Sequence, residues 1–191
     1  WATDYGPTTY GSPDQGGNIA IPYLLDARNT VFEFDGGIRK AAGANLLNST
    51  VLSGSTSVTG VYDYWRQGLV GSPQQRRLVH TNGTVQYDQG DGTFTSLFTG
   101  LAADTVPNFS TFDDLLIFST SAEAEVPRSW DQTTGQVLAG SPPRFSFSAP
   151  HKNRQWSAGV YSVPSRLYYS ASLDPEDWIG AGSGSIDIDP N

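Results

Sequence analysis

The sequence contains no cysteine and no methionine. Without cysteine, disulfide bonds, thiolate metal sites and a cysteine nucleophile are excluded. No apolar run approaches the roughly 18 residues that a membrane-spanning helix needs; the longest runs are a few residues, such as Leu115 to Phe118. Because methionine is missing even at position 1, we expect a processed or trimmed product, or a piece of a longer protein.

Basic residues are scarce, and most of the 11 are arginine, with lysine only at positions 40 and 152. Against 19 acidic residues they leave a formal net charge of −8. General nucleic-acid binding depends on Lys and Arg that displace counterions from phosphate, so this balance argues against it. The preference for arginine suits planar, bidentate ion pairs at packed interfaces.

Aromatic residues make up 12% of the sequence, and 21 glycines and 12 prolines are spread along it. This composition, without sustained helical stripes, is typical of an all-β protein rich in turns. Short runs that fit strands of about five or six residues recur from Val31 onward. They are VFEF (31–34), VTGVYDYW (58–65), RLVHT (77–81), DLLIFS (114–119), RFSFSA (144–149), RLYYSA (166–171) and SIDID (185–189).

Turn signals separate these runs. The pair Asn82–Gly83 and the segment QGDGT (89–93) carry the Asn-Gly or Asp-Gly chemistry of tight hairpins. The polar group His151–Arg154, in the stretch PHKNRQW, lies between two alternating runs. We therefore interpret it as a hairpin tip and not as a chemical or phosphate-binding site.

An aromatic residue followed by a turn recurs about every 40 residues, at Tyr87, Trp130 and Tyr169, with Phe34 as an earlier copy. A period of about 40–45 residues holding four short strands is typical of a β-propeller blade. We predict an all-β fold of repeated four-stranded antiparallel units. It would be propeller-like, either an incomplete propeller or a fragment of a larger one.

Glycine, proline, serine and threonine dominate the start of the sequence, which predicts an extended N-terminal arm over 1–30. Blades are expected over 31–191. Their approximate bounds are 31–55, 57–101, 107–140 and 144–189.

Residues that could carry chemistry are dispersed. The only histidines, His80 and His151, lack the close spacing of metal ligands. The segment DQGDGTF (88–94) lacks the terminal Glu of a calcium loop, so a hairpin turn is favoured. In LDPEDW (173–178), adjacent carboxylates favour a capped proline turn, because adjacency does not make them converge. We predict no enzyme activity, no metal site and no cofactor.

Four local patterns occur together. They are a Gly-Gly-Ile-Arg-Lys turn (Gly36–Lys40), an Asn-Arg hairpin before Trp156, a Pro-Ser-Arg-Leu-Tyr-Tyr-Ser strand (Pro164–Ser170) and a Leu-Asp-Pro-Glu-Asp-Trp segment (173–178). In this combination the sequence resembles the tail-tube or nozzle proteins of short-tailed bacteriophages.

The resemblance implies a structural protein of the virion, located in the phage tail, that assembles with copies of itself into a ring of six subunits. The ring would continue the DNA ejection channel below the portal and adaptor and would contact other tail proteins. DNA would pass through without specific binding, and no membrane is involved. The acidic balance agrees with this, because an anionic wall repels the phosphate backbone.

Charged residues are the expected contacts between neighbouring subunits, through ion pairs that gain strength when desolvated. They are Arg39, Lys40, Arg76, Arg77, Lys152, Arg154, Asp187 and Asp189.

A carbohydrate-binding or glycan-hydrolysing β-propeller that recognises a host surface is an alternative. Its sugar platforms would be exposed tryptophans, namely Trp65, Trp130, Trp156 and Trp178. Its acids would be Asp174, Glu176 or Asp177. A host-receptor adhesin would use the same aromatic surface.

Overall fold

The structure, a computed structural model, describes residues 30–32, 38–40, 48, 51–52, 57–67 and 74–188. Strands β1 (Thr30–Phe32) and β2 (Ile38–Lys40) pair antiparallel and belong to a first unit, Trp1–Leu46. All further strands belong to a second unit, Leu47–Asn191. Across these described ranges there is no helix, and so none that could span a membrane.

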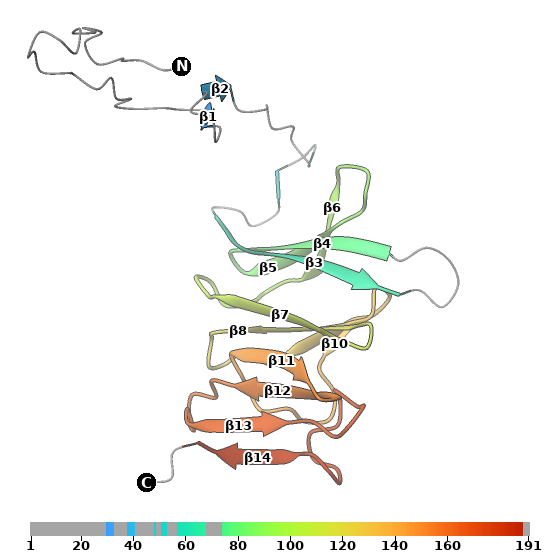
Figure 1. Cartoon of the computed structure of the whole chain (residues 1–191), viewed down its shortest axis with the longest axis vertical. Coiled ribbons are helices and arrows are strands. Elements are labelled where there is room, and N and C mark those ends of the chain that lie inside the picture. The colour runs from blue at the N-terminus through green and yellow to red at the C-terminus, as the bar shows by residue number, and fades with distance from the viewer. Residues whose placement is uncertain are drawn as a thin grey trace, which may run out of the picture. The chain divides into compact units, whose positions relative to one another are not determined.

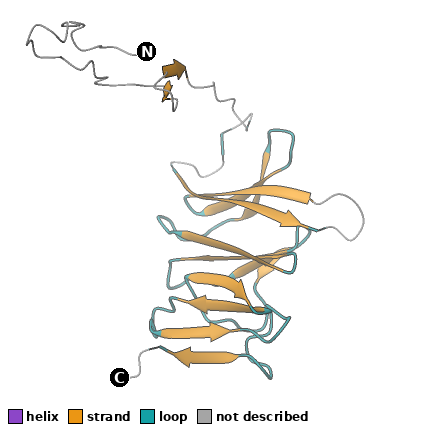
Figure 2. Ribbon diagram, in the orientation of Figure 1, coloured by secondary structure: helices purple, strands orange, loops and turns teal. Residues whose placement is uncertain are grey.

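The described residues of the second unit form three four-stranded sheets (Figures 1 and 2). Sheet A consists of β3 (Val58–Arg66), β4 (Gln74–Thr81), β5 (Thr84–Asp88) and β6 (Phe94–Phe98). Sheet B consists of β7 (Pro107–Phe112), β8 (Leu115–Thr120), β9 (Arg128–Trp130) and β10 (Gly135–Val137). Sheet C consists of β11 (Phe147–His151), β12 (Arg154–Ala158), β13 (Arg166–Tyr169) and β14 (Gly184–Asp187).

Each sheet is an antiparallel meander in which the strands follow one another in chain order. The predicted fold class is therefore confirmed: the protein is all-β with repeated four-stranded antiparallel units. The described sheets do not close into a ring. The division into an arm and four blades stays a prediction, because residues 1–29 and most of 31–55 lie outside the described residues.

The HKNR group, residues His151–Arg154, is a hairpin tip, as predicted. His151 pairs with Arg154, and the two residues between them, Lys152 and Asn153, have φ of 48° and 59°. Positive φ at both central residues is the turn that matches the twist of the flanking strands. The strand before it begins at Phe147, later than the predicted run 144–149, because the chain at Phe145 enters the core without pairing.

Strand β8 is buried on both faces, because its alternate residues point into different cores. Leu116 and Phe118 enter the core shared with sheet A, and Ile117 enters the core next to sheet C. Their exposed fractions are 0%, 1% and 0%, respectively. Sheet B is thus the middle layer, with sheets A and C on its two faces.

The interface between sheets A and B is apolar and aromatic. Tyr62 of β3 stacks on Phe109 of β7, with ring centroids 5.4 Å apart and planes 11° apart. The backbone of β3 at Gly60 also lies close to the ring of Pro107 in β7, since a Cβ on Gly60 would lie 2.4 Å from Cγ of Pro107. A glycine at position 60 therefore lets the first strands of the two sheets meet.

The interface between sheets B and C includes a buried polar network. Gln155 of β12 is 0% exposed and donates through Nε2 to Oγ of Ser110, 2.8 Å away. Ser110 in turn lies 3.0 Å from Oγ of Ser148, whose backbone N–H donates to Oδ1 of Asn108 at 2.8 Å. Buried polar groups without partners are costly, so this network favours one alignment of the two sheets.

Gly140, after β10, should resist substitution. It has φ of 74°, and a Cβ there would lie 1.7 Å from the backbone oxygen of Glu176. The matched control is Gly90, which has φ of 87° and nothing within 4 Å. Alanine at either position meets the strain of positive φ, about 1–2 kcal/mol. Gly140→Ala also overpacks, so urea denaturation should show a free energy of unfolding lower than that of Gly90→Ala by about 1–3 kcal/mol. Equal losses would contradict this packing.

Candidate functional site

Arg76 and Arg77 are adjacent on β4 and so point to opposite faces of sheet A. The guanidinium of Arg76 lies 6.0 Å from the centroid of the Tyr87 ring and donates to the backbone carbonyl of Asp88 at 3.2 Å. Nε of Arg77 lies 3.1 Å from Oδ1 of Asp63, and these side chains are 38% and 47% exposed. Arg77 is therefore the better candidate for a contact with another subunit.

Lys152 and Arg154 also differ in how far their side chains are exposed to solvent. Lys152 is exposed at the hairpin tip. Arg154 is partly buried, with its guanidinium 5.2 Å from the centroid of the Tyr169 ring of β13. It donates to the backbone carbonyl of Ser170 at 2.7 Å and to that of Gly182. Arg154 thus ties β12 to the loop before β14.

Asp187 forms a two-pronged ion pair with Arg166 across strands β13 and β14, with N–O distances of 2.6 Å and 3.1 Å. The hydrogen bond from Arg166 lowers the pKa of the Asp187 carboxyl. Asp189 lies outside the described residues, and only the backbone of Arg39 and Lys40 is described. For all the proposed contact residues, a role between subunits stays a prediction.

The carboxylates of the 173–178 segment do not converge. Oδ1 of Asp174 accepts the backbone N–H of Glu176 at 2.9 Å, and Oδ1 of Asp177 accepts that of Gly180 at 2.7 Å. Oε1 of Glu176 accepts the hydroxyl of Ser129 in sheet B at 3.3 Å. Asp174 and Asp177 therefore cap turns, and Glu176 links the loop before β14 to sheet B.

The DQGDGTF loop is also built as a turn. Oδ1 of Asp88 accepts the N–H of Gly90 at 2.7 Å. Oδ1 of Asp91 accepts the backbone N–H and hydroxyl of Thr93 at 2.9 Å and 2.6 Å, and the hydroxyl bond is the main cause that lowers the pKa of Asp91. Within the described ranges, no group of three or more His, Asp or Glu is arranged to bind a metal ion.

Two of the four tryptophans considered as sugar platforms lie in the core. Trp130 is 2% exposed and Trp178 is 8% exposed, so neither can stack on a sugar from solvent. Trp65 is 53% exposed on sheet A, and Trp156 is partly exposed on sheet C. The sequence could not separate them, because all four stand in similar strand or turn contexts.

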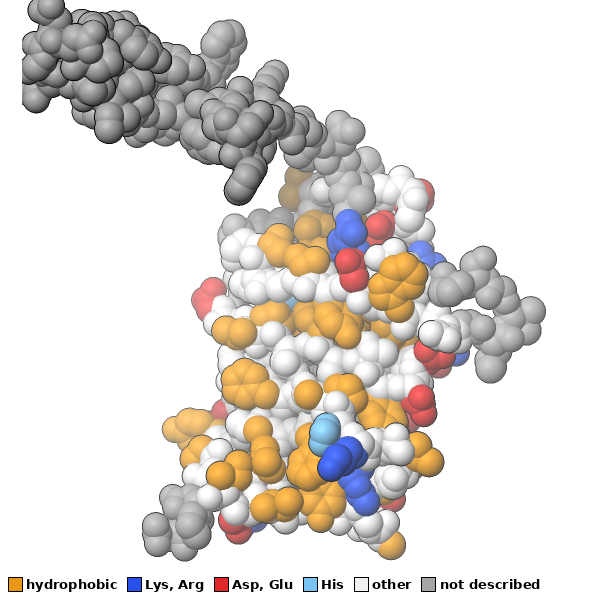
Figure 3. Space-filling model, in the orientation of Figure 1, with side chains coloured by type: hydrophobic (Ala, Val, Ile, Leu, Met, Phe, Trp, Pro, Cys, Tyr) orange, Lys and Arg blue, Asp and Glu red, His pale blue; other side chains and the backbone are white. Residues whose placement is uncertain are grey.

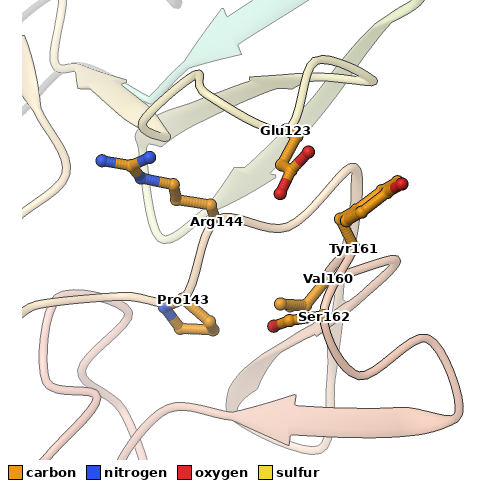
Figure 4. A pocket seen from close by; sticks show the side chains of 6 residues that line it. All are labelled: Glu123, Pro143, Arg144, Val160, Tyr161 and Ser162. Atoms are coloured by element: carbon orange, nitrogen blue, oxygen red, sulfur yellow. The ribbon is translucent and has the colours of Figure 1, made fainter.

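The depression in Figure 4 has a volume of about 250 Å³ and lies among loops of sheets B and C. Its lining residues are Glu123, Pro143, Arg144, Val160, Tyr161 and Ser162. Figure 4 shows the ends of Arg144 and Tyr161 extending away from each other, and Tyr161 is 73% exposed. These two side chains thus do not converge on one point in the depression.

Sequence reasoning missed the outward face of sheet C. It carries aromatic and aliphatic side chains, including Phe147, Trp156, Tyr169 and Ile186. Phe147 is 57% exposed and Ile186 is 48% exposed. Figure 3 shows hydrophobic side chains gathered over this part of the molecule, beside Lys, Arg and His side chains. The sequence signal for this face was the alternation of side chains along the strands. Alternation shows that a sheet has two distinct faces, but it does not show which face another sheet covers.

Two titratable side chains are buried between sheets A and B. Burial raises the pKa of Tyr64 to about 12, and its hydroxyl donates to the carbonyl of Asp114. His80 is 0% exposed, with Nδ1 bonded to the hydroxyl of Thr59 and its ring 5.9 Å from that of Phe118. Nε2 of His80 has no partner among the described residues, and burial lowers the pKa of His80.

Comparison of the sequence and structure with models of protein families, with curated proteins and with solved structures finds no significant match. The residues and their geometry therefore carry the functional argument.

Burial of His80 should make the protein less stable in mild acid. Its pKa is lowered from 6.5 by folding, so the unfolded chain binds the proton first. The stability that depends on neutral His80 is therefore full above about pH 6.5 and is lost as the pH falls towards its lower folded pKa. Thermal melts from about pH 8 to about pH 5 should show a smaller fall in Tm for His80→Gln than for the parent. His151→Gln, at an exposed position, should keep the parent's fall; equal falls in all three proteins would contradict this.

Proposed function

We propose that the protein is a structural component of a phage tail nozzle or tail tube. It assembles with copies of itself into a ring that continues the DNA ejection channel below the portal and adaptor. The observation that supports this best is the series of three four-stranded meanders that bury one another's faces. Such an architecture grows by adding further sheets of the same kind.

Three of the four segments that carry the resemblance have structural roles in the described part of the fold, and the two glycines of the fourth, Gly36–Lys40, lie outside the described residues. The HKNR group is a tight hairpin, Pro164–Ser170 contains β13, and 173–178 is a capped turn anchored by buried Trp178. Side chains held for packing and turn formation are those expected of an assembly protein.

The distribution of charge supports passage of DNA rather than its capture. Arg76 and Arg154 donate to backbone carbonyls, and Arg77 and Arg166 pair with carboxylates. The two carboxylate pairs offset the charge of two of the 11 basic residues, and acidic residues outnumber basic ones by 19 to 11, which disfavours binding through displacement of counterions from phosphate. With a net charge of −8, the protein as a whole repels a polyanion.

Particle imaging and DNA binding test the proposal together. We expect ring-shaped particles with an open centre in negative-stain electron microscopy, and no measurable affinity for duplex DNA at physiological ionic strength. Particles that stay monomeric at high concentration, or DNA binding that weakens steeply with salt, would contradict it.

Arg77 gives a sharper test of the predicted contacts. Arg77→Glu places a like charge opposite Asp63, so the exposed pair is lost at a cost of only about 0–1 kcal/mol to the fold. We expect nearly parental thermal stability but impaired ring assembly, measured by analytical ultracentrifugation. Arg166→Glu breaks a second exposed pair among the described residues, on sheet C, and is the matched control that should still assemble. Rings formed equally well by both variants would exclude Arg77 from the contact.

A carbohydrate-binding protein is the second candidate, and the exposure of Trp65 favours it. An exposed indole face offers a stacking platform for a sugar ring. Glycan binding that is lost in Trp65→Ala, by a protein that forms no rings, would support this candidate over the tail component.

A further inference from the structure

Sheet A presents a recognisable arrangement on the face that packs against sheet B. Arg76 of the second strand lies over the ring of Tyr87 of the third strand, 6.0 Å from its centroid. It donates to the carbonyl of the next residue, Asp88, and to that of Gln89 at 3.1 Å. Leu78, two residues after the arginine, is paired with Tyr87. Arginine, tyrosine and an apolar residue thus form one patch.

Sheet B covers this patch. Leu116, Phe118 and Trp130 of sheet B share a core with the patch, and the rings of Trp130 and Tyr87 lie 4.7 Å apart. The arrangement on sheet A is therefore one half of an interface between two sheets.

Sheet C repeats the arrangement on its free face. Arg154 of the second strand lies 5.2 Å from the ring centroid of Tyr169 of the third strand and donates to the carbonyl of the next residue, Ser170. It also donates to the carbonyl of Gly182. Trp156, two residues after the arginine, is paired with Tyr169, with ring centroids 5.0 Å apart. Strand by strand, these residues match those of sheet A.

The two patches also face the same way along the series of sheets. On sheet A the patch faces sheet B, the next sheet in the chain, and on sheet C it faces away from sheet B. No described residue covers it as sheet B covers sheet A, and Phe147 and Ile186 beside it are 57% and 48% exposed. Removal of such exposed apolar side chains from water is favourable, so this face favours a partner sheet.

The opposite end of the series offers a face that can fill this place. On the outer face of sheet A, Val61 and Trp65 of β3 are 59% and 53% exposed, and Asp63 lies between them. Val79 and Gln86 of the same face are already buried, so its free part is centred on β3. The outward positions of sheet C include Arg154 but no carboxylate. The outer face of sheet A carries Asp63, whose carboxylate is paired with Arg77 but is 47% exposed, so it can accept a further donor from a partner.

We propose that the free face of sheet C, around Phe147, Trp156 and Tyr169, binds the β3 side of sheet A of a second copy of this chain, head to tail. The contact repeats the packing seen within one chain. There, the first strands of sheets A and B, β3 and β7, meet through Tyr62 and Phe109. In the proposed contact, β11 of one copy would meet β3 of the next copy in the same way. Head-to-tail contacts between identical chains generate rings when the rotation closes. This inference rests on the proposed assembly into a ring and names the surfaces that form it.

Cysteine cross-linking tests the contact in a chain that has no native cysteine. Ala149→Cys lies on the free face of sheet C, and Val61→Cys lies on the outer face of sheet A. Under mild oxidation, a mixture of the two variants should give a disulfide-linked heterodimer, and each variant alone should stay largely uncross-linked. A chain with both substitutions should give a ladder or a closed ring of linked subunits.

The other outcomes separate this contact from the proposed function. Homodimers of Ala149→Cys alone would show that sheet C meets itself, and would overturn the head-to-tail contact. Rings without cross-links would overturn the contact but leave the ring assembly standing. An absence of both rings and cross-links would count against both.

Charge substitution on the same face provides an independent readout. Phe147→Lys, at an exposed position, should keep the parental thermal melt and weaken self-association at least about tenfold, as measured by sedimentation. Tyr161→Lys, at a loop position that is 73% exposed and away from both faces, should associate as the parent does. Equal association of both variants would exclude Phe147 from the contact.

Discussion

Burial of each sheet's faces against the next sheet is the constraint on which this protein depends. A four-stranded meander is too thin to hide apolar side chains on its own, and alternate residues of a strand point to opposite faces. Strand β8 shows the result, since Leu116, Ile117 and Phe118 are all buried although they point in two directions. Each such side chain stabilises the fold by about 1.5–3 kcal/mol, so removal of either neighbouring sheet would expose a large part of the core.

The two interfaces contribute different properties. At the interface between sheets A and B, the rings of Tyr62, Tyr87 and Trp130 bury apolar surface. Aromatic pairs also prefer certain ring orientations, so these contacts favour particular positions of the two sheets. The second interface adds the network of Gln155, Ser110 and Ser148, which contributes less net energy but penalises misalignment. Apolar burial thus holds the series together, and polar pairing fixes the position of sheet C.

Much of the architecture could be predicted from sequence, because alternation and turn residues act locally. The HKNR hairpin and the four-stranded repeats are of this kind. The aromatic repeat marked Tyr87, Trp130 and Tyr169 as equivalent positions near strand ends, and the structure has each on the third strand of its sheet. The repeat could not show that Trp130 points to the preceding sheet and contacts Tyr87. Burial of Trp178 and the partners of Arg154 depend on segments distant in sequence, for which a single sequence carries no local signal.

The central claim is that sheets A and B are stable only together. Amide hydrogen exchange of Phe118→Ala tests it most directly, because Phe118 is on sheet B but fills the core beneath sheet A. The account predicts that protection falls by a similar factor in β4 and β5 of sheet A and in β8 of sheet B, since the sheets open as one unit. Loss of protection confined to β7–β10, with sheet A unchanged, would show that each sheet is stable by itself and would contradict the account.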